Sequence, residues 1–281
     1  MGTSLFIIAN KNGVACASDT DYSIHQLSKE EPVAIIVCKS SPLPWEDIIG
    51  SYRDKGEPEY HTDFSEYAND FAKFLATYHD NLPKMHIAGD DLRVIFLGYG
   101  TDDIYPSIYD TSVIVGEDGG ISMQEGKLEK ITHENNVVWK HIGDFDSLSV
   151  LFNGVTPQMR KQMKTAIGIK YKAFKDVTEN SFKATENEKP AHDAFEKFDA
   201  DKMADKACDK ATSTFNKQAA TGLETFSIEE MIYACESLVN ANIRINHLKA
   251  GGKGLLGQTR EIAIVVRTEG VTWIKHSLFA K

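Results

Sequence analysis

The chain has 281 residues, of which 42% are hydrophobic and 26% are charged. This length allows one large domain or two small ones, and the composition is ordinary for a globular protein. The formal net charge is -10, from 31 basic against 41 acidic side chains, and the sequence contains no basic block. Because binding to a nucleic-acid backbone depends on clustered lysine and arginine, we expect no nucleic-acid partner.

The sequence also lacks the patterns of membrane insertion and export. No apolar run reaches the ~20 residues that a membrane-spanning helix needs. The first residues show no basic segment followed by a signal-type apolar core. We therefore expect a cytoplasmic protein with no membrane partner.

The first third of the chain is predicted to form a hairpin, a further strand and two helices. Asn12-Gly13 is the strongest short hairpin signal, and Pro44 is a favoured first helix residue. Apolar residues follow a strand-like run in VAIIVC and a helical period in the later segments. The predicted elements are strands at 3–10, 14–18 and 33–38, and helices at 44–55 and 63–78.

The middle of the chain changes character at residue 156. Before it, strands are predicted at 92–99, 112–115, 121–123 and 137–139, and a helical stretch at 145–152. Residues 156–222 are rich in Lys, Glu, Asp and Ala, with apolar residues at helical spacing. They predict two or three long helices around a polar connection near 179–190. This helical insertion is either a solvated surface or one that packs on another subunit.

The C-terminal part predicts one capped helix and a closing strand pair. Ser227 is followed three residues later by Glu230, which is the signature of a capping box, and the helix is expected to reach Leu248. Strands are predicted at 262–266 and 271–274. Helices thus occur in blocks and not after each strand, which favours a layered α+β sandwich over a doubly wound parallel sheet.

Several stretches together resemble one known family. They are Thr3 with its strand, VACASD up to Asp19, SIHQLSKEEPVAIIV (23–37), PWEDIIGSYR (44–53), EYANDFAKFL (66–75), ESLVNANIRI (236–245) and EIAIVVRTEGVTWIK (261–275). Their order and spacing resemble the proteasome β-type N-terminal nucleophile (Ntn) hydrolases, most closely a bacterial group of uncharacterised proteasome-like proteins. The resemblance implies one domain over 1–281, with the insertion at 156–222. It also implies a four-layer αββα sandwich with its active site at one end of the sheets.

The same resemblance implies a threonine peptidase or amidohydrolase that cleaves peptide or other amide bonds. Thr3 falls on the nucleophile, and its own α-amine, exposed by cleavage after Gly2, acts as the base because the pKa of such an amine lies near neutrality. Asp19 falls on the aspartate that orients the site. Ser23 falls on the position at which the family carries a lysine. No cofactor is implied.

Two positions depart from the family pattern. Ser23 supplies no positive charge, and Asp21 stands where a basic residue is common, so two carboxylates are expected near the amine and raise its pKa. Lys29 restores the charge only under a shifted strand alignment. The alternative is therefore a catalytically inactive protein that keeps the fold as a structural or interaction module. The residue beside Thr3 Oγ1, basic or not, separates the two hypotheses.

The expected partners follow from the same resemblance. Members of the family assemble through their helical layers into rings or stacks, which implies a homo-oligomer here, with a peptide as the possible substrate. The histidines show neither HxH nor HExxH spacing, and the four cysteines show no zinc-type pair. The glycines at 251–257 lack the Lys-Ser/Thr ending of a phosphate loop. We therefore expect no metal and no cofactor.

Overall fold

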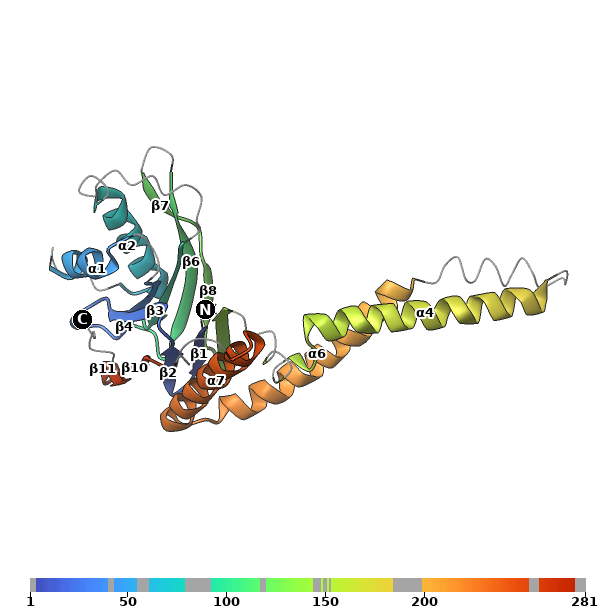
Figure 1. Cartoon of the computed structure of the whole chain (residues 1–281). Helices are drawn as coiled ribbons and strands as arrows, with labels where there is room; N and C mark the ends of the chain where they lie inside the picture. The colour runs from blue at the N-terminus through green and yellow to red at the C-terminus, as the bar shows by residue number, and fades with distance from the viewer. Residues whose placement is uncertain are drawn as a thin grey trace. The chain divides into compact units, whose positions relative to one another are not determined.

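The chain divides into two compact units (Figure 1): Met1–Phe145 with Gly222–Lys281 form the first unit, and Asp146–Thr221 form the second. The second unit falls in the region where the sequence predicts an insertion. The computed structural model describes residues 4–39, 43–54, 61–78, 92–116, 120–143, 148, 151, 153–183, 199–252 and 258–275. Thr3 lies outside the described residues.

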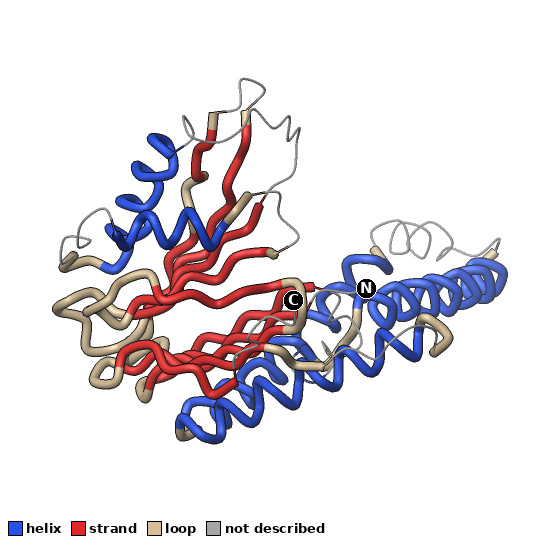
Figure 2. The backbone as a smooth tube through the Cα atoms, turned by 60° about the vertical axis from the view of Figure 1, so that its left-hand side comes forward, coloured by secondary structure: helices blue, strands red, loops and turns tan. Residues whose placement is uncertain are grey.

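The first unit contains two antiparallel sheets, which Figure 2 shows as two stacked groups of strands. The first sheet has the order β11-β10-β2-β1-β9, and the second has the order β3-β4-β5-β6-β7, with β8 paired to β6. The first sheet consists of β1 (Ser4–Asn10), β2 (Gly13–Ser18), β9 (Val137–Gly143), β10 (Glu261–Val266) and β11 (Gly270–Lys275). The second consists of β3 (Tyr22–Gln26), β4 (Val33–Cys38), β5 (Leu92–Gly98), β6 (Ser107–Val115), β7 (Ile121–Met123) and β8 (Lys127–Lys130).

The central strands β1 and β2 are covered on both faces. Leu5, Ile7 and Ala9 belong to the core between the two sheets, together with Ile36 and Ile95 of the second sheet. Every residue of β1 and β2 is buried. This double coverage explains why the two strands read as continuous apolar or small-residue runs and not as alternating ones.

Helices cover the outer face of each sheet. On the second sheet, α1 (Trp45–Asp54) and α2 (Phe64–Tyr78) share a core with β4 and β5, in which Phe71 meets Phe96 edge to face. On the first sheet, α7 (Ile228–Lys249) packs against β1, β2 and β10. The order of layers is therefore α1/α2, second sheet, first sheet, α7. The predicted α+β class is confirmed.

The start of α7 is fixed by polar contacts. The capping box is present as predicted, with Ser227 Oγ accepting from Glu230 N and the Glu230 carboxylate accepting from Ser227 N. The buried Asn10 at the end of β1 donates through Nδ2 to the carbonyls of Leu223 and Phe226, at 3.0 and 2.9 Å. These bonds tie the β1–β2 hairpin to the turn that precedes α7.

Two strands, β3 and β8, are not among the predicted elements, and two others are longer than predicted. β8 has the sequence KLEK and lacks the apolar signal of a strand, because Glu129 pairs with Lys140 of β9 and with Lys127 in the same strand. β6 begins five residues before its predicted start at 112, and β9 extends beyond 139 to Gly143. The helical stretch predicted at 145–152 and the connection near 179–190 lie largely outside the described residues.

The second unit contains two long helices, α4 (Pro157–Phe182) and α6 (Ala200–Glu224). Thr156 caps α4 by accepting from Met159 N at 3.0 Å, and Pro157 occupies a first-turn position. In the part of the chain that the structure describes, no helix combines the length and apolar character needed to cross a membrane.

Candidate functional site

One end of the two sheets carries the candidate site. There β1 begins at Ser4, β2 ends at Ser18 and β10 begins at Glu261, which pairs with Ser18. Asp19 follows directly, and its backbone N–H donates to the Ser4 carbonyl at 3.0 Å. The structure thus brings Asp19 to the residue that follows Thr3 in the sequence. The position of Thr3 itself lies outside the described residues.

The carboxylate of Asp19 is buried and has little access to water. Its side chain accepts from Asp21 N at 3.0 Å, and the residue is only 5% exposed. Burial raises the pKa of Asp19 to about 6, and the nearby Asp21 carboxylate adds to this, against the opposing effect of hydrogen bonds from Asp21 and Ser4. Asp19 therefore changes its charge close to neutral pH.

The raised pKa of Asp19 predicts a pH-dependent stability. Because the folded state holds this proton more tightly than the unfolded state, the stabilisation is complete below about pH 4 and is lost as the pH rises through about 6. Asp19→Asn keeps an acceptor for Asp21 N and removes the charge. We expect it to raise the free energy of unfolding at pH 7.5 by roughly 1–2 kcal/mol, with little effect at pH 4. Urea unfolding at the two pH values measures this difference, and an equal pH dependence in both proteins would contradict it.

Ser23 lies away from this arrangement. It pairs with Val37 on β4, and paired residues of neighbouring strands project from the same face. Val37 belongs to the core beneath α1 and α2, whereas Tyr22 and Ile24 belong to the core between the sheets. The Ser23 hydroxyl lies 2.8 Å from His25 Nε2. The structure therefore places Ser23 on the helix-covered face and does not bring its side chain toward the inter-sheet space beside Asp19.

Lys29 does not supply the missing cation either. Its Nζ lies 3.3 Å from Asp54 at the end of α1, with the two side chains 64% and 77% exposed. This is a solvated surface pair. The shifted strand alignment that would bring Lys29 to the site is not the one that the structure adopts.

Sequence reasoning missed a buried ion pair at this end of the sheets. Lys39 follows β4, and its Nζ contacts Glu261 Oε1 at 2.6 Å. The Glu261 side chain is 3% exposed, and its other oxygen accepts from Ile24 N at 2.8 Å. Glu261 therefore joins β10 in the first sheet to β3 in the second. A single charge at the end of an apolar run usually indicates a solvated strand end, so no local signal identified this pair.

Hydrogen bonds connect the ion pair to Asp19. The backbone N–H of Lys39 donates to the Asp21 carbonyl at 2.7 Å, and Asp21 N donates in turn to Asp19. On the other side, Glu261 pairs with Ser18, the neighbour of Asp19. Lys39, Glu261 and Asp19 therefore form one continuous set of contacts around the start of β1.

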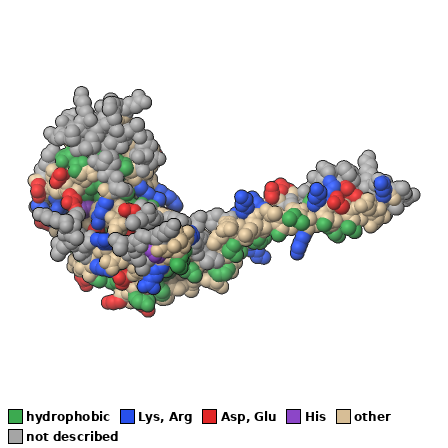
Figure 3. Space-filling view, viewed as in Figure 1, with side chains coloured by type: hydrophobic (Ala, Val, Ile, Leu, Met, Phe, Trp, Pro, Cys, Tyr) green, Lys and Arg blue, Asp and Glu red, His purple; other side chains and the backbone are tan. Residues whose placement is uncertain are grey.

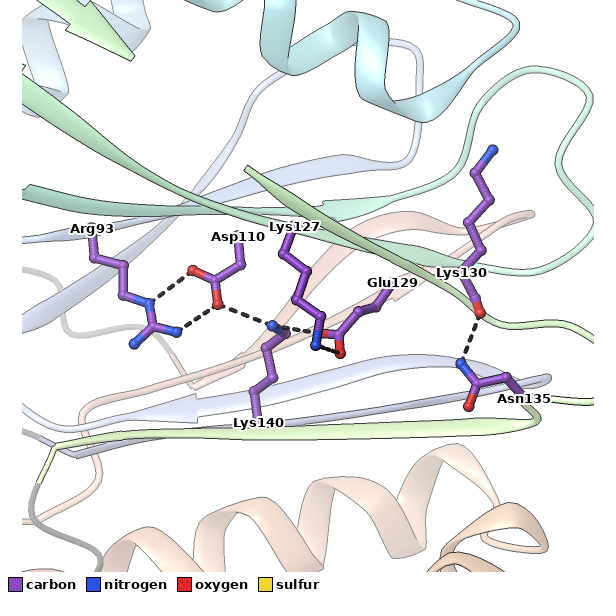
Figure 4. A network of polar contacts seen from close by, with 7 residues as sticks. All are labelled: Arg93, Asp110, Lys127, Glu129, Lys130, Asn135 and Lys140. Carbon is purple, nitrogen blue, oxygen red and sulfur yellow. Dashed lines mark hydrogen bonds and ion pairs between the residues drawn. The ribbon is translucent and has the colours of Figure 1, made fainter. Parts of the chain in front are cut away.

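A second polar network joins the sheets farther along β1 (Figure 4). Lys140 on β9, opposite Ile7 of β1, contacts Asp110 on β6 at 2.9 Å and Glu129 on β8 at 2.5 Å. Arg93 of β5 holds Asp110 through both Nε and a terminal nitrogen. These ion pairs keep the pKa values of the Asp110 and Glu129 carboxyls below their usual range despite partial burial. The network fixes the edge strands of the two sheets against each other.

The site thus offers a buried carboxylate that titrates near neutrality and a cation held at a defined place. Within the described residues, no group of three or more His, Cys, Asp or Glu side chains is arranged to hold a metal ion. No protein-family model matches the chain, and no curated protein is significantly similar to it. The geometry of the site and the motifs of the sequence therefore carry the evidence for its function.

Proposed function

We propose that this chain is an N-terminal threonine hydrolase that cleaves peptide or other amide bonds, with the fold of a proteasome β-type subunit. Two stacked antiparallel sheets between helical layers support this proposal. The strand β1, which follows Thr3, also supports the proposal, because it begins at the end of the sheets where Asp19 lies. The proposal requires Thr3 to be the first residue of the mature chain.

The observation that carries the proposal is the Lys39–Glu261 pair. Threonine proteases of this kind need a positive charge near the nucleophile, and Ser23 cannot provide one. Lys39, the residue after β4, provides a cation within the set of contacts that joins Asp19 to the start of β1. The function of the absent lysine is thus assigned to Lys39.

The chemistry requires only the chain's own groups. The free α-amine of Thr3 takes the proton from Oγ1 as Oγ1 attacks the substrate carbonyl carbon, and the resulting ammonium then protonates the leaving amine. Water, deprotonated by the same amine, attacks the ester and releases the acid and the threonine hydroxyl. Ionised Asp19 stabilises the ammonium formed in the first step, so activity is expected to rise as the pH passes through about 6.

A second candidate is an inactive structural or interaction protein that has kept the fold. The observation that favours it is the Ser23–His25 contact, because the family's lysine position carries a hydroxyl bonded to a neighbouring histidine on the helix-covered face. In this case Lys39 acts only to neutralise Glu261.

The intact mass of the purified, untagged protein separates the two candidates. We expect the wild-type chain to have the mass of residues 3–281, because attack of Thr3 Oγ1 on the Gly2 carbonyl releases the preceding residues. Thr3→Ala is expected to keep Gly2. Retention of Gly2 in both proteins would contradict the hydrolase and support the structural candidate.

A further inference from the structure

A polar side chain interrupts the apolar stripe by which α7 packs on the first sheet. The buried residues of this helix recur at helical spacing and are Met231, Cys235, Val239, Asn242 and Ile243. Asn242 is fully buried, at a position where the rest of the stripe carries apolar side chains. Because burying an amide costs free energy unless its polar atoms find partners, the contacts of Asn242 indicate its role.

The amide of Asn242 is bonded at one end. Its Nδ2 donates to Ser4 Oγ at 2.9 Å, whereas its Oδ1 is buried without a hydrogen-bond partner among the described residues. An amide with a buried, unbonded oxygen stabilises a fold less than a well-packed apolar side chain of the same size. Stability alone therefore does not explain an asparagine at this position.

Ser4 lies between Asn242 and Asp19. Leu5 and Ile7 belong to the core between the sheets, so Ser4 projects to the opposite face of β1, which α7 covers (Figure 1). The Asp19 carboxylate accepts hydrogen bonds from the backbone N–H and from the hydroxyl of Ser4. A continuous series of hydrogen bonds therefore runs from Asn242 on α7 through Ser4 to Asp19.

The direction of each hydrogen bond in this series follows from the chemistry of its groups. An ionised carboxylate only accepts, so the single hydroxyl proton of Ser4 is directed to Asp19. Ser4 Oγ then acts as an acceptor toward Asn242, and only the Nδ2 end of the amide can donate to it. The positive end of the amide dipole thus lies next to the hydroxyl that binds Asp19, and it strengthens that hydrogen bond.

We propose that Asn242 is a positioning residue of the candidate site, which directs the Ser4 hydroxyl to the Asp19 carboxylate and holds that carboxylate beside the start of β1. Its catalytic meaning rests on the proposed hydrolase, in which ionised Asp19 stabilises the ammonium of Thr3. The series of hydrogen bonds itself does not depend on catalysis, so it can be tested separately.

Fixed donors matter for Asp19 because it is shielded from water. Water solvates acidic side chains at the surface, such as those in red on the first unit in Figure 3, whereas Asp19 is buried. Asp21 raises the pKa of Asp19 by repulsion, and α7 contributes the neutral amide of Asn242. The charged and titratable groups at this end of the sheets are Asp21, Tyr22 and the paired Lys39 and Glu261. Removing the amide is therefore expected to make ionisation of Asp19 harder.

A carbon-13 NMR titration of the Asp19 carboxyl in the full chain tests the proposal without an activity measurement, and Asp19→Asn assigns the signal. Asn242→Leu keeps the approximate size of the side chain and removes its donors. We expect it to raise the midpoint of the Asp19 titration by about 0.5–1 pH unit and to unfold at nearly the wild-type urea concentration. Asn242→Ala gives the same comparison if leucine disturbs the packing.

A double variant tests whether Asn242 acts through Ser4. Ser4→Ala removes the hydroxyl that joins the two residues and is expected to raise the Asp19 midpoint at least as much as Asn242→Leu. Ser4→Ala/Asn242→Leu is then expected to titrate like Ser4→Ala alone. An unchanged Asp19 midpoint in folded Asn242→Leu, or two shifts that add in the double variant, would overturn the proposal.

Asn10→Leu is the matched control, because Asn10 is also a buried asparagine of the first sheet and lies at the other end of β1. Its replacement removes the donors to the Leu223 and Phe226 carbonyls. We expect it to lower the urea midpoint somewhat and to leave the Asp19 titration unchanged. An equal shift of the Asp19 midpoint in Asn10→Leu would show general loosening of the sheet and would overturn the proposal.

The pH–rate profile provides a second readout for the proposed hydrolase. In Asn242→Leu its acidic limb is expected to move to higher pH by the same amount as the Asp19 midpoint, with rates that approach those of the wild type above about pH 8. An acidic limb that stays in place despite a shifted Asp19 midpoint would overturn the catalytic part of the proposal. An inactive wild type with the expected NMR shifts would contradict the hydrolase and still support the positioning of Asp19 by Asn242.

Discussion

Replacing Thr3 by alanine is expected to abolish amide hydrolysis by this protein. Alanine has no Oγ1, so neither the acyl intermediate nor self-cleavage after Gly2 can form, and loss of a covalent nucleophile typically costs about 10³-fold or more in rate. The rate is measured with a panel of fluorogenic peptide amides on fully folded protein.

Thr3→Ser is the matched control, since serine keeps the hydroxyl and loses only a methyl group. We expect it to undergo processing and to retain measurable activity, which alanine does not. Equal rates in the wild type and Thr3→Ala would exclude Thr3 as the nucleophile. A wild type without activity that also keeps Gly2 would favour the structural candidate.

Replacing Lys39 is expected to lower the free energy of unfolding more than any other substitution considered for this protein. Lys39→Met leaves the Glu261 carboxylate, whose side chain is 3% exposed, without its cation. Removing one partner of a buried pair costs about 3–5 kcal/mol, and the partial exposure of Lys39 places this case at or below the lower end of that range, at roughly 2–3 kcal/mol. Urea unfolding measures the lost free energy of unfolding for the first unit. Hydrogen exchange measures the loss at β10 and β3, the strands that Glu261 joins.

Lys29→Met is the control for Lys39→Met, because it removes the same side chain from an exposed pair with Asp54. It is expected to cost less than about 0.5 kcal/mol. The double variant Lys39→Met/Glu261→Gln is expected to recover much of the lost stability, since it leaves no unpaired charge. If Lys39→Met costs no more than Lys29→Met, the pair does not hold the two sheets together as argued.

Most elements of the first unit were predictable because each has a local signal. VAIIVC corresponds to β4, the helical period around Phe71 to α2, and Ser227 with Glu230 to the start of α7. These signals arise from burial on one or both faces, which the side-chain pattern records directly. β8 had no such signal, because its charged residues are neutralised by ion pairs with residues distant in sequence or alternate in the strand.

The candidate site was predictable only in part. Asp19 follows a buried strand, and its backbone lies beside Ser4. The direction of the Ser23 side chain follows from its pairing with Val37, and a single residue of register decides which face it joins. Periodicity in an edge strand as short as β3 does not establish that register.

The sequence by itself determined the order of most strands and helices, the α+β class and the separate composition of the second unit, because each depends on residues close together in the chain. Only the tertiary structure decided where the charges lie. Lys39 and Glu261 are 222 residues apart, and their attraction becomes strong only after folding buries Glu261 and part of Lys39. The candidate site therefore includes a contact that no local pattern encodes.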